Sequence, residues 1–589
     1  MKRILRTAVI CGAALTMVST AALSASADDA GLAFDDPQPG FAPAGTVLAE
    51  AGPAEVGLDP APLQEAWQRV VAATGPEGER DHPLFPGAVL TYGHDGHVVM
   101  QEATGHSRLF ADGQGTELPE AEQIATSTDT IYDLASVSKL FTSVVVMQQV
   151  EAGRVALDEP VTTYIPEFTD PAPGADPDEP AEHDKSGITI RQLLTHTSGF
   201  PAWVPLWSTQ PDPQSRLHAA LTAALVDEPG TTYTYSDLNL ITLAEVASRV
   251  SGQSLDELVR TGITEPLGMD DTGYNPDPSL RPRIAATEFQ ATPDRGVVWG
   301  EVHDENAWSL GGVAGHAGVF STADDLSRLA QAMLNGGSYD GQRVLSEQSV
   351  QQMITNENTE FPEDAHGLGF ELDQRWYMGG LASPRTAGHT GYTGTSLVLD
   401  FSSRSFVILL TNRVHPSRSW GSPNPVRVAA AQGLAEAMAV RPQRGEDFWH
   451  TGTEPRTDAA LTWSLVVPRT GGQLEFETLV DVESTDPLHL EVSTDSGETW
   501  APLPWSLDGA PVTGPYAASG LRQWQHAEAA LPSGRVQVRW RQTTDASLSG
   551  RGVHLDDIRL TLGRGQAQVG TEDAPWRLVA DDGWERVTR

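Results

Sequence analysis

The chain has 589 residues, of which 39% are hydrophobic, and its formal net charge is −41 at pH 7. This length exceeds one ordinary domain and predicts two or three, and the hydrophobic content suffices for packed cores. The acidic excess argues against nucleic acid or an anionic membrane surface as a partner.

The first 27 residues have the pattern of a secretory signal peptide. A basic start (residues 2–6) precedes an apolar stretch (residues 7–23) and an Ala25-Ser-Ala27 cleavage site. The single cysteine, Cys11, lies inside this segment, so we expect a mature chain with no disulfide and no thiol nucleophile. No later apolar run is long enough to span a bilayer. We therefore expect a secreted or periplasmic protein that is cleaved near Ala27.

Residues 28–50 are rich in Asp, Pro and Gly and predict a flexible N-terminal segment. A helix is predicted over residues 60–73, and residues 87–100 predict a hairpin that turns at Asp95-Gly96. Further elements are expected as helices at 237–251, 323–334 and 426–438, and as strands at 396–400 and 406–411. A hairpin, many helices and then strands again predict one α+β domain over residues 51–442, whose sheet joins the two ends of the segment.

From residue 450 the pattern changes. Residues 450–565 contain short alternating runs separated by turn residues, which predicts an all-β sandwich or jelly roll, followed by a tail at 566–589. Within it, Ser493-Thr-Asp-Ser-Gly-Glu-Thr-Trp500 matches the Asp-box turn pattern. One copy cannot build a propeller, which needs repeats.

Ser136 and Lys139 are the first candidates for chemistry. They stand three residues apart at the start of a helical pattern, so their side chains share one face of the first turn. A serine hydroxyl needs a neighbouring base to become a nucleophile, and a lysine can serve once its surroundings tune its pKa. The chain contains only three lysines and uses arginine almost everywhere else, which favours a functional role for this one over a chance surface lysine.

Two later tripeptides complete the pattern. Tyr235-Ser-Asp237 precedes a predicted helix, where the tyrosine could assist proton transfer or simply pack in the core. His389-Thr390-Gly391 lies in a Gly-rich run before a strand, where it could line a substrate site or form a tight turn. The backbone N–H groups of Ser136 and Tyr392 would then be the oxyanion donors.

Taken in this order, with Leu193-Leu-Thr-His-Thr-Ser-Gly199 between them, these motifs resemble the serine β-lactamase/penicillin-binding-protein superfamily. They are nearest in pattern to class C β-lactamases and their DD-peptidase and esterase relatives. The resemblance implies an α+β domain made of an antiparallel sheet flanked by helices and an all-helical subdomain. It also implies Ser136 as nucleophile, Lys139 and Tyr235 as acid/base groups, and no cofactor.

Two residues depart from the superfamily pattern. Asp237 replaces the usual Asn, and its negative charge would raise the pKa of Lys139. His389 replaces the usual Lys, so a fixed cation that meets a β-lactam carboxylate is lost.

These departures favour cell-wall peptides as substrates, by DD-carboxypeptidase or related amidase chemistry. A small-ester carboxylesterase is the alternative, a β-lactamase comes third and a non-catalytic binding protein last. A polysaccharide contact through the C-terminal sandwich stays open.

A further acidic and histidine-containing segment, His303-Asp304-Glu305 with His316, has no standard metal-ligand spacing. We therefore expect it, like His196, to be structural or to line the pocket, and we expect no metal site.

Overall fold

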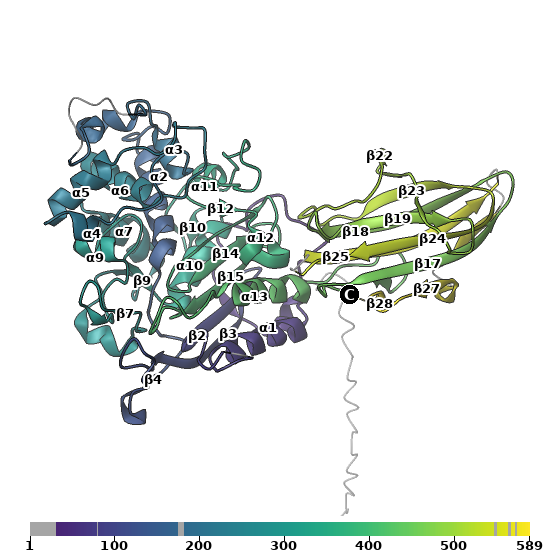
Figure 1. Ribbon diagram of the computed structural model, residues 1–589, viewed down its shortest axis with the longest axis horizontal. Helices are drawn as coiled ribbons and strands as arrows, with labels where there is room; N and C mark the ends of the chain where they lie inside the picture. Colours follow the sequence, from purple (N-terminus) through teal and green to yellow (C-terminus); the bar gives the residue numbers. More distant parts are fainter. Residues whose placement is uncertain are drawn as a thin grey trace, which may run out of the picture.

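The computed structural model describes residues 31–78, 80–174, 182–546, 550–563, 567–571 and 574–588. The predicted signal peptide lies outside these residues. Figure 1 shows two parts side by side, an α+β part that ends with α13 (Asn424–Ala437) and a β part that begins with β16 (Phe448–His450).

One large sheet organises the α+β part. Its strands run in the order β1-β3-β2-β15-β14-β13-β12, and β4 pairs with β3. Their bounds are β1 Ala49–Glu50, β2 Gly87–His94, β3 His97–Arg108, β4 Ile124–Ala125, β12 Glu371–Leu372, β13 Thr386–Thr390, β14 Ser396–Asp400 and β15 Ser405–Thr411. The pairing of β15 with β2 confirms that the sheet joins the two ends of this part. The predicted hairpin turn is also confirmed, because Asp95 and Gly96 have the positive φ angles, 42° and 81°, that a two-residue type I′ turn needs.

Helices cover both faces of this sheet. Alternate residues of β2 point to opposite sides, so Leu90 packs with the helices α1 (Pro60–Ala73) and α13 (Asn424–Ala437), while Val89 packs with α10 (Ala323–Leu334). The remaining helices lie mostly in the helical region beyond α10 (Figure 1). They are α2 Ser138–Glu151, α3 Ile190–Leu194, α4 Leu206–Thr209, α5 Pro213–Thr222, α6 Asp237–Ser251, α7 Leu255–Val259, α8 Glu265–Leu267, α9 Glu305–Ser309, α11 Glu347–Met353 and α12 Arg375–Met378. Short strands complete it: β5 Tyr132–Asp133, β6 Gly273–Tyr274, β7 Phe289–Gln290, β8 Gly296–Val297, β9 Val319–Ser321, β10 Ser338–Tyr339 and β11 Gln342–Arg343.

The caps of α6 explain why its bounds could be predicted. Ser236 accepts a hydrogen bond from the Leu238 amide at the N-terminus, and Gly252 ends the helix with a φ of 73°. α10 begins in the same way, because the Thr322 side chain accepts from the Asp325 amide.

The β part is a sandwich of two sheets. One has the order β22-β21-β23-β18-β25-β16-β28, with β26 beside β25, and the other has the order β20-β19-β24-β17-β27. Buried side chains of both sheets, among them Phe476 and Trp540, form one core. The bounds are β16 Phe448–His450, β17 Asp458–Val467, β18 Gly472–Val482, β19 Leu488–Ser493, β20 Ala501–Pro502, β21 Trp505–Leu507, β22 Ala510–Val512, β23 Gln525–Leu531, β24 Gly534–Thr543, β25 Gly550–Leu562, β26 Ala567–Gly570, β27 Leu578–Ala580 and β28 Glu585–Val587.

Both expected chain-end segments are more structured than the sequence predicts. Within residues 31–50, Phe34 is buried, and the guanidinium groups of Arg522 and Arg551 each lie 4.7 Å from its ring centroid. After residue 565, β27 pairs with β17, and β28 pairs with β16. Burial and strand pairing therefore hold segments whose composition alone resembles linker and tail.

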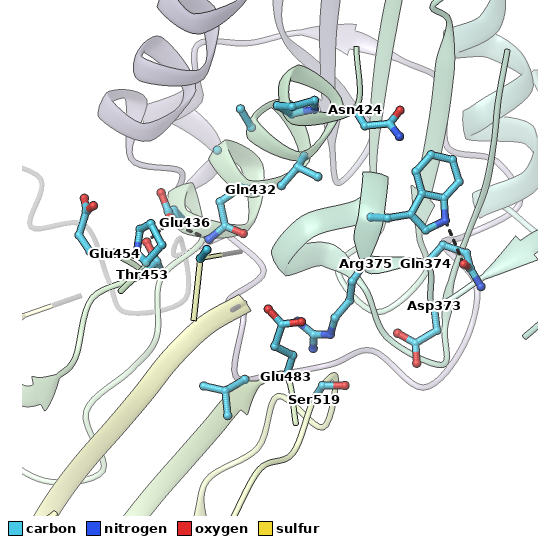
Figure 2. Close-up of a pocket in the computed structure, with 18 of the residues that line it drawn as sticks. Asp373, Gln374, Arg375, Asn424, Gln432, Glu436, Thr453, Glu454, Glu483 and Ser519 are labelled. Carbon is cyan, nitrogen blue, oxygen red and sulfur yellow. Dashed lines mark hydrogen bonds between the residues drawn. The ribbon is translucent and has the colours of Figure 1, made fainter. Parts of the chain in front are cut away.

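The two parts are joined by a buried ion pair and flank a large cleft. Arg522 Nη1 donates to Asp400 Oδ2 at 2.6 Å, and both side chains are buried. The cleft has a volume of about 1230 Å³. Trp376 and Glu436 of the α+β part and Glu483 of the β part are among its lining residues (Figure 2). None of the helices in the described stretches has the length and apolar character that crossing a lipid bilayer requires.

Candidate active site

Ser136 and Lys139 meet at the start of α2. Ser136 lies in a single 3-10 turn, Ala135–Val137, that runs directly into this helix. Lys139 Nζ donates to Ser136 Oγ at 2.8 Å and to the backbone oxygen of His316 at 3.2 Å. The lysine is buried, with 1% of its surface exposed. The three-residue spacing thus brings the hydroxyl and the amine into direct contact.

Asp237 is the third member of this cluster. It is the first residue of α6, and its Oδ1 lies 2.8 Å from Lys139 Nζ. Burial alone would lower the pKa of Lys139, but the negative charge of Asp237 and hydrogen bonds with Asp237 and Tyr235 outweigh it and raise that pKa above its usual value. Lys139 is therefore an ammonium group in the resting protein and cannot accept a proton until it has lost one.

Tyr235 lies above the same ammonium group. The Lys139 Nζ atom is 4.8 Å from the centroid of its ring. Burial raises the pKa of Tyr235 to about 12, and the charge of Lys139 and side-chain hydrogen bonds with Lys139 and Ser136 hold it down. The phenol is therefore neutral at pH 7 and remains in contact with the serine and the lysine.

His196 supports Tyr235 from behind. The two ring centroids are 4.7 Å apart, and His196 Nδ1 accepts a hydrogen bond from the Ser236 amide at 3.0 Å. Burial lowers the pKa of His196 well below its ordinary value, so the ring is neutral. This geometry gives His196 the structural role that the sequence predicts for it.

The backbone before the nucleophile has an unusual conformation. Ala135 has a φ of 47°, a region that residues other than glycine rarely occupy. Asp133 holds it there, because Asp133 Oδ1 accepts from the Ala135 amide at 2.9 Å and Oδ2 accepts from the His303 amide at 2.6 Å. Strain of this kind at a functional residue fixes the direction in which the serine points.

The strand β13 brings the second motif to the pocket that contains Ser136. Thr390, Gly391 and Tyr392 line the same pocket as Ser136. A Cβ atom at Gly391 would lie 2.3 Å from the Leu134 backbone oxygen, so only glycine fits there. The Thr395 hydroxyl donates to that same oxygen at 2.9 Å, which fixes the end of β13 against the segment before Ser136.

His389 precedes this contact on β13. Its side chain is 1% exposed, and burial lowers its pKa to about 3. Nδ1 lies 2.8 Å from the Thr390 backbone oxygen. The His389 ring is therefore neutral, and it does not supply the fixed positive charge of the lysine that it replaces.

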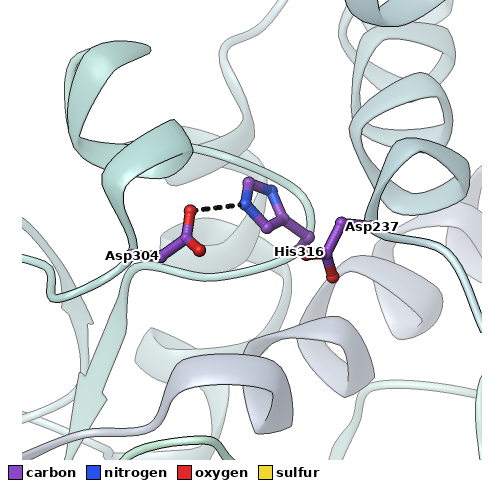
Figure 3. A group of neighbouring side chains, drawn as sticks. All are labelled: Asp237, Asp304 and His316. Atoms are coloured by element: carbon purple, nitrogen blue, oxygen red, sulfur yellow. Dashed lines mark hydrogen bonds and ion pairs between the residues drawn. The ribbon is translucent and has the colours of Figure 1, made fainter. Parts of the chain in front are cut away.

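The acidic and histidine-containing segment lies behind the site. His303 Nε2 is 2.9 Å from Glu288 Oε2, and its ring stacks on Tyr392 with centroids 5.9 Å apart. His316 Nε2 is 2.8 Å from Asp304 Oδ1, and Asp304 also accepts from the Ala307 amide at the start of α9 (Figure 3).

Potential ligand atoms of Asp304, His316 and Asp237 lie within 4.8 Å of one another, although the sequence spacing gave no indication of a metal site. All three already have partners, because Asp237 binds Lys139 and Asp304 and His316 bind each other. The contact between Asp304 and His316 holds the loop that carries the His316 carbonyl.

The pocket around Ser136 has a volume of about 370 Å³ and contains charged residues that the motifs do not indicate. Arg413 and Arg427 both line it. Burial lowers the pKa of Arg427 to about 10, so it still carries its charge at pH 7. Glu371 of β12 also lines the pocket, and burial raises its pKa to about 7. No local pattern marks these three, because they follow or belong to elements far from Ser136 in sequence.

Comparisons with known proteins place the chain in a family. The family model described as Beta-lactamase matches residues 77–432. The chain belongs to the β-lactamase family. A protein of Salmonella agona, provisionally named a D-alanyl-D-alanine carboxypeptidase, is 33% identical over 416 residues, which cover 64% of this chain and 89% of that protein.

Two solved structures of penicillin-binding-protein homologues also match. The one from Caulobacter crescentus is 21% identical with a TM-score of 0.48, covering 64% of this chain and 97% of its own. The octameric one from Pyrococcus abyssi is 18% identical with a TM-score of 0.48, covering 82% and 99%.

Membership of the β-lactamase family confirms the α+β fold and the enzyme class that the motifs predict. This β-lactamase-family protein is a serine hydrolase of the β-lactamase and penicillin-binding-protein type. The family match ends at residue 432, so the sandwich that follows is an addition to the matched region.

Proposed function

We propose that this protein is a D-alanyl-D-alanine carboxypeptidase that works through an acyl-enzyme on Ser136. The observation that carries the proposal is the 2.8 Å contact between Ser136 Oγ and Lys139 Nζ in a pocket that also contains Arg413 and Arg427. The contact between Ser136 and Lys139 supplies a nucleophile, and the two arginines supply positive charge for the free carboxylate at the end of a peptide. The name of the Salmonella agona relative supports the same substrate class.

Acylation begins with the removal of a proton from Ser136. Lys139 first passes a proton to Asp237, 2.8 Å away, and its neutral amine then takes the proton of the Ser136 hydroxyl. The serine oxygen bonds to the carbonyl carbon of the penultimate residue, and the C–N bond to the terminal residue breaks. Tyr235 donates its proton to the leaving nitrogen and regains one from Lys139.

Deacylation reverses this proton flow. Water attacks the ester carbon, its proton passes to the Tyr235 and Lys139 pair, and the serine oxygen leaves and recovers its proton. Lys139 and Asp237 return to their resting charges. The sum is one peptide bond and one water consumed, with a shortened peptide and one free amino acid released.

The backbone N–H groups of Ser136 and Tyr392 act as the oxyanion donors in both steps. Two contacts support this assignment: the Thr395 bond to the Leu134 carbonyl, and a Thr393 hydroxyl that donates to the Asp133 carbonyl at 2.7 Å. Both tie the loop that carries Tyr392 to the segment that carries Ser136. Preorganised donors at such a position contribute on the order of 3–4 kcal/mol of transition-state stabilisation.

Arg413 is the residue that distinguishes a carboxypeptidase from an esterase in this pocket. Its guanidinium lies 4.9 Å from the Tyr392 ring centroid, and one nitrogen donates to the Arg418 backbone oxygen at 3.2 Å. A terminal carboxylate placed there gains a charge-assisted contact, whereas a neutral ester gains nothing. The lysine that is missing at position 389 is replaced in this way by an arginine from the loop after β15.

The large cleft extends the pocket toward the β part. Trp376 and Asn424 line both spaces. We assign this cleft to the remainder of a cell-wall strand, with the sandwich as its second wall and its polysaccharide contact. The signal peptide predicted at residues 1–27 fits an enzyme that meets such a substrate outside the cytoplasm.

The test is intact-mass spectrometry combined with turnover. The wild-type chain, Ser136→Ala and the exposed-serine control Ser186→Ala are each mixed with a D-Ala-D-Ala peptide, a p-nitrophenyl ester and a penicillin. We expect wild type and Ser186→Ala to release D-alanine and to form adducts, and Ser136→Ala to do neither while keeping its melting temperature. Arg413→Gln should raise KM for the peptide about tenfold or more and leave that for the ester within twofold.

Other outcomes assign the activity differently. Turnover of the ester alone by the wild type would make the protein a carboxylesterase, and efficient turnover of the penicillin alone would make it a β-lactamase. Peptide turnover that survives in Ser136→Ala would contradict the proposed nucleophile.

A further inference from the structure

Three carboxylates meet in the β part, in loops at the wall of the large cleft. Glu483 and Asp486 belong to the loop between β18 and β19, and Asp545 follows β24. One oxygen of each lies within 4.8 Å of one oxygen of both others. Figure 2 shows Glu483 at the cleft, close to Arg375 of α12.

Two of these carboxylates have oxygens that are buried without a partner. Asp486 is 0% exposed, and its Oδ1 accepts from the Asp545 amide at 2.7 Å. Asp486 Oδ2 and Glu483 Oε1 are buried and have no hydrogen-bond partner in the described part of the chain. A buried carboxylate oxygen left unpaired is costly, so such groups are found where a partner of positive charge binds.

Among the described residues, the charges that act on Glu483 and Asp486 do not balance their own. Burial raises the pKa of both Glu483 and Asp486, and Asp545 raises both further by repulsion. The opposing cation is Arg375, which lowers both pKa values but is itself paired with Asp481 at 3.4 Å. One guanidinium therefore faces four carboxylates, and the cluster keeps a net negative charge.

We propose that Glu483, Asp486 and Asp545 bind a calcium ion. Two oxygens on opposite sides of a Ca²⁺ ion lie about 4.6–5.2 Å apart, twice the usual Ca–O distance, so three oxygens within 4.8 Å can share one ion. Mg²⁺ demands a near-ideal octahedron and keeps several of its waters, so a set of three carboxylates from two loops favours Ca²⁺. The set contains no nitrogen or sulfur ligand, which disfavours zinc.

The site would add a second connection between two loops that the hydrogen bond from the Asp545 amide to Asp486 already joins. One is the β18–β19 loop, and the other is the segment after β24 that leads to β25. Since Glu483 also lines the cleft, a bound ion fixes the wall opposite α12. This inference does not depend on the chemistry at Ser136.

The test uses the full chain after removal of divalent ions with a chelator. Isothermal titration calorimetry with CaCl₂ should give one site per chain, and saturating Ca²⁺ should raise the melting temperature by about 5 °C. MgCl₂ at equal concentration should have at most a third of that effect. Glu498→Gln removes an equal charge from an exposed turn elsewhere in the β part and should respond as the wild type does.

Asp486→Asn and Glu483→Gln make the test specific. Each should lose the calcium response, and each should melt at or above the temperature of the calcium-free wild type because a repulsive charge has gone. Two results would overturn the proposal: no calcium-specific heat in the wild type, or calcium binding in both variants that equals that of the wild type. If one variant does not fold, the other carries the same comparison.

Discussion

Replacing Asp237 by asparagine tests the assignment of the resting charges in the active site. Asp237 Oδ1 lies 2.8 Å from Lys139 Nζ, and with an effective dielectric constant of about 20 this pair is worth about 6 kcal/mol. Solvent reaches the aspartate, whose side chain is 17% exposed, so we take about half, or about 3 kcal/mol. Asparagine keeps the hydrogen-bond acceptor and loses only the charge.

The expected consequence is a new pH dependence of acylation. About 3 kcal/mol corresponds to about two pH units, so the ammonium of Lys139 in Asp237→Asn should lose its proton within the measurable alkaline range. The variant also lacks the carboxylate that takes the lysine proton. We therefore expect acylation to be about 10–100-fold slower at pH 7 and to recover with rising pH to within a few fold of the wild type.

Stopped-flow acylation by a fluorescent penicillin or a p-nitrophenyl ester, from pH 6 to 10.5, measures this directly. Glu245→Gln neutralises a carboxylate on the same helix, where it pairs with Arg249, and should leave the profile unchanged. If the profiles of Asp237→Asn and wild type superimpose, Asp237 does not set the charge of Lys139 and the reasoning fails.

Three further predictions follow from buried groups. Gly391→Ala should reduce acylation by more than about 30-fold with little effect on KM, measured in the same stopped-flow assay, because its Cβ would lie 2.0 Å from Thr395 Oγ1. Burial raises the pKa of Glu371 from 4.5 to about 7. The contribution of this carboxyl group to the free energy of unfolding is therefore fully present below pH 4.5 and is lost as the pH rises through 7. The free energy of unfolding measured in urea should fall by up to about 3 kcal/mol between pH 4.5 and 7 in the wild type, and it should not fall in Glu371→Gln. Arg522→Met should cost about 3–5 kcal/mol in the same unfolding assay because it leaves the buried charge of Asp400 without its guanidinium. The double variant with Asp400→Leu should recover most of this loss, and an equal loss in both variants would contradict the ion-pair argument.

Local signals predicted the elements that local forces determine. The turn at Asp95-Gly96 and the ends of α6 depend on residues within a few positions of one another, so the sequence contains the whole explanation. The contact between Ser136 and Lys139 is of the same kind, since a three-residue spacing at a helix start suffices.

Long-range packing explains what the sequence does not show. Composition marks residues 28–50 as flexible, but Phe34 is buried under Arg522 and Arg551, which lie at the other end of the chain. Arg413 and Arg427 reach the pocket only because β15 and β13 belong to one sheet, with β14 between them, and because α13 packs on that sheet. No motif could have indicated these two arginines, because no pattern in the sequence around them links them to Ser136.

The ion pair between Arg522 and Asp400 also limits how the chain can be divided. Asp400 ends β14 and pairs in register with Thr386 at the start of β13, the strand that ends in the His389–Gly391 motif. A protein shortened to the family-matched region would keep this carboxylate and lose its guanidinium. The sandwich thus stabilises β13, the strand that leads into the catalytic motif. Producing the two parts separately would require Asp400 to be replaced first.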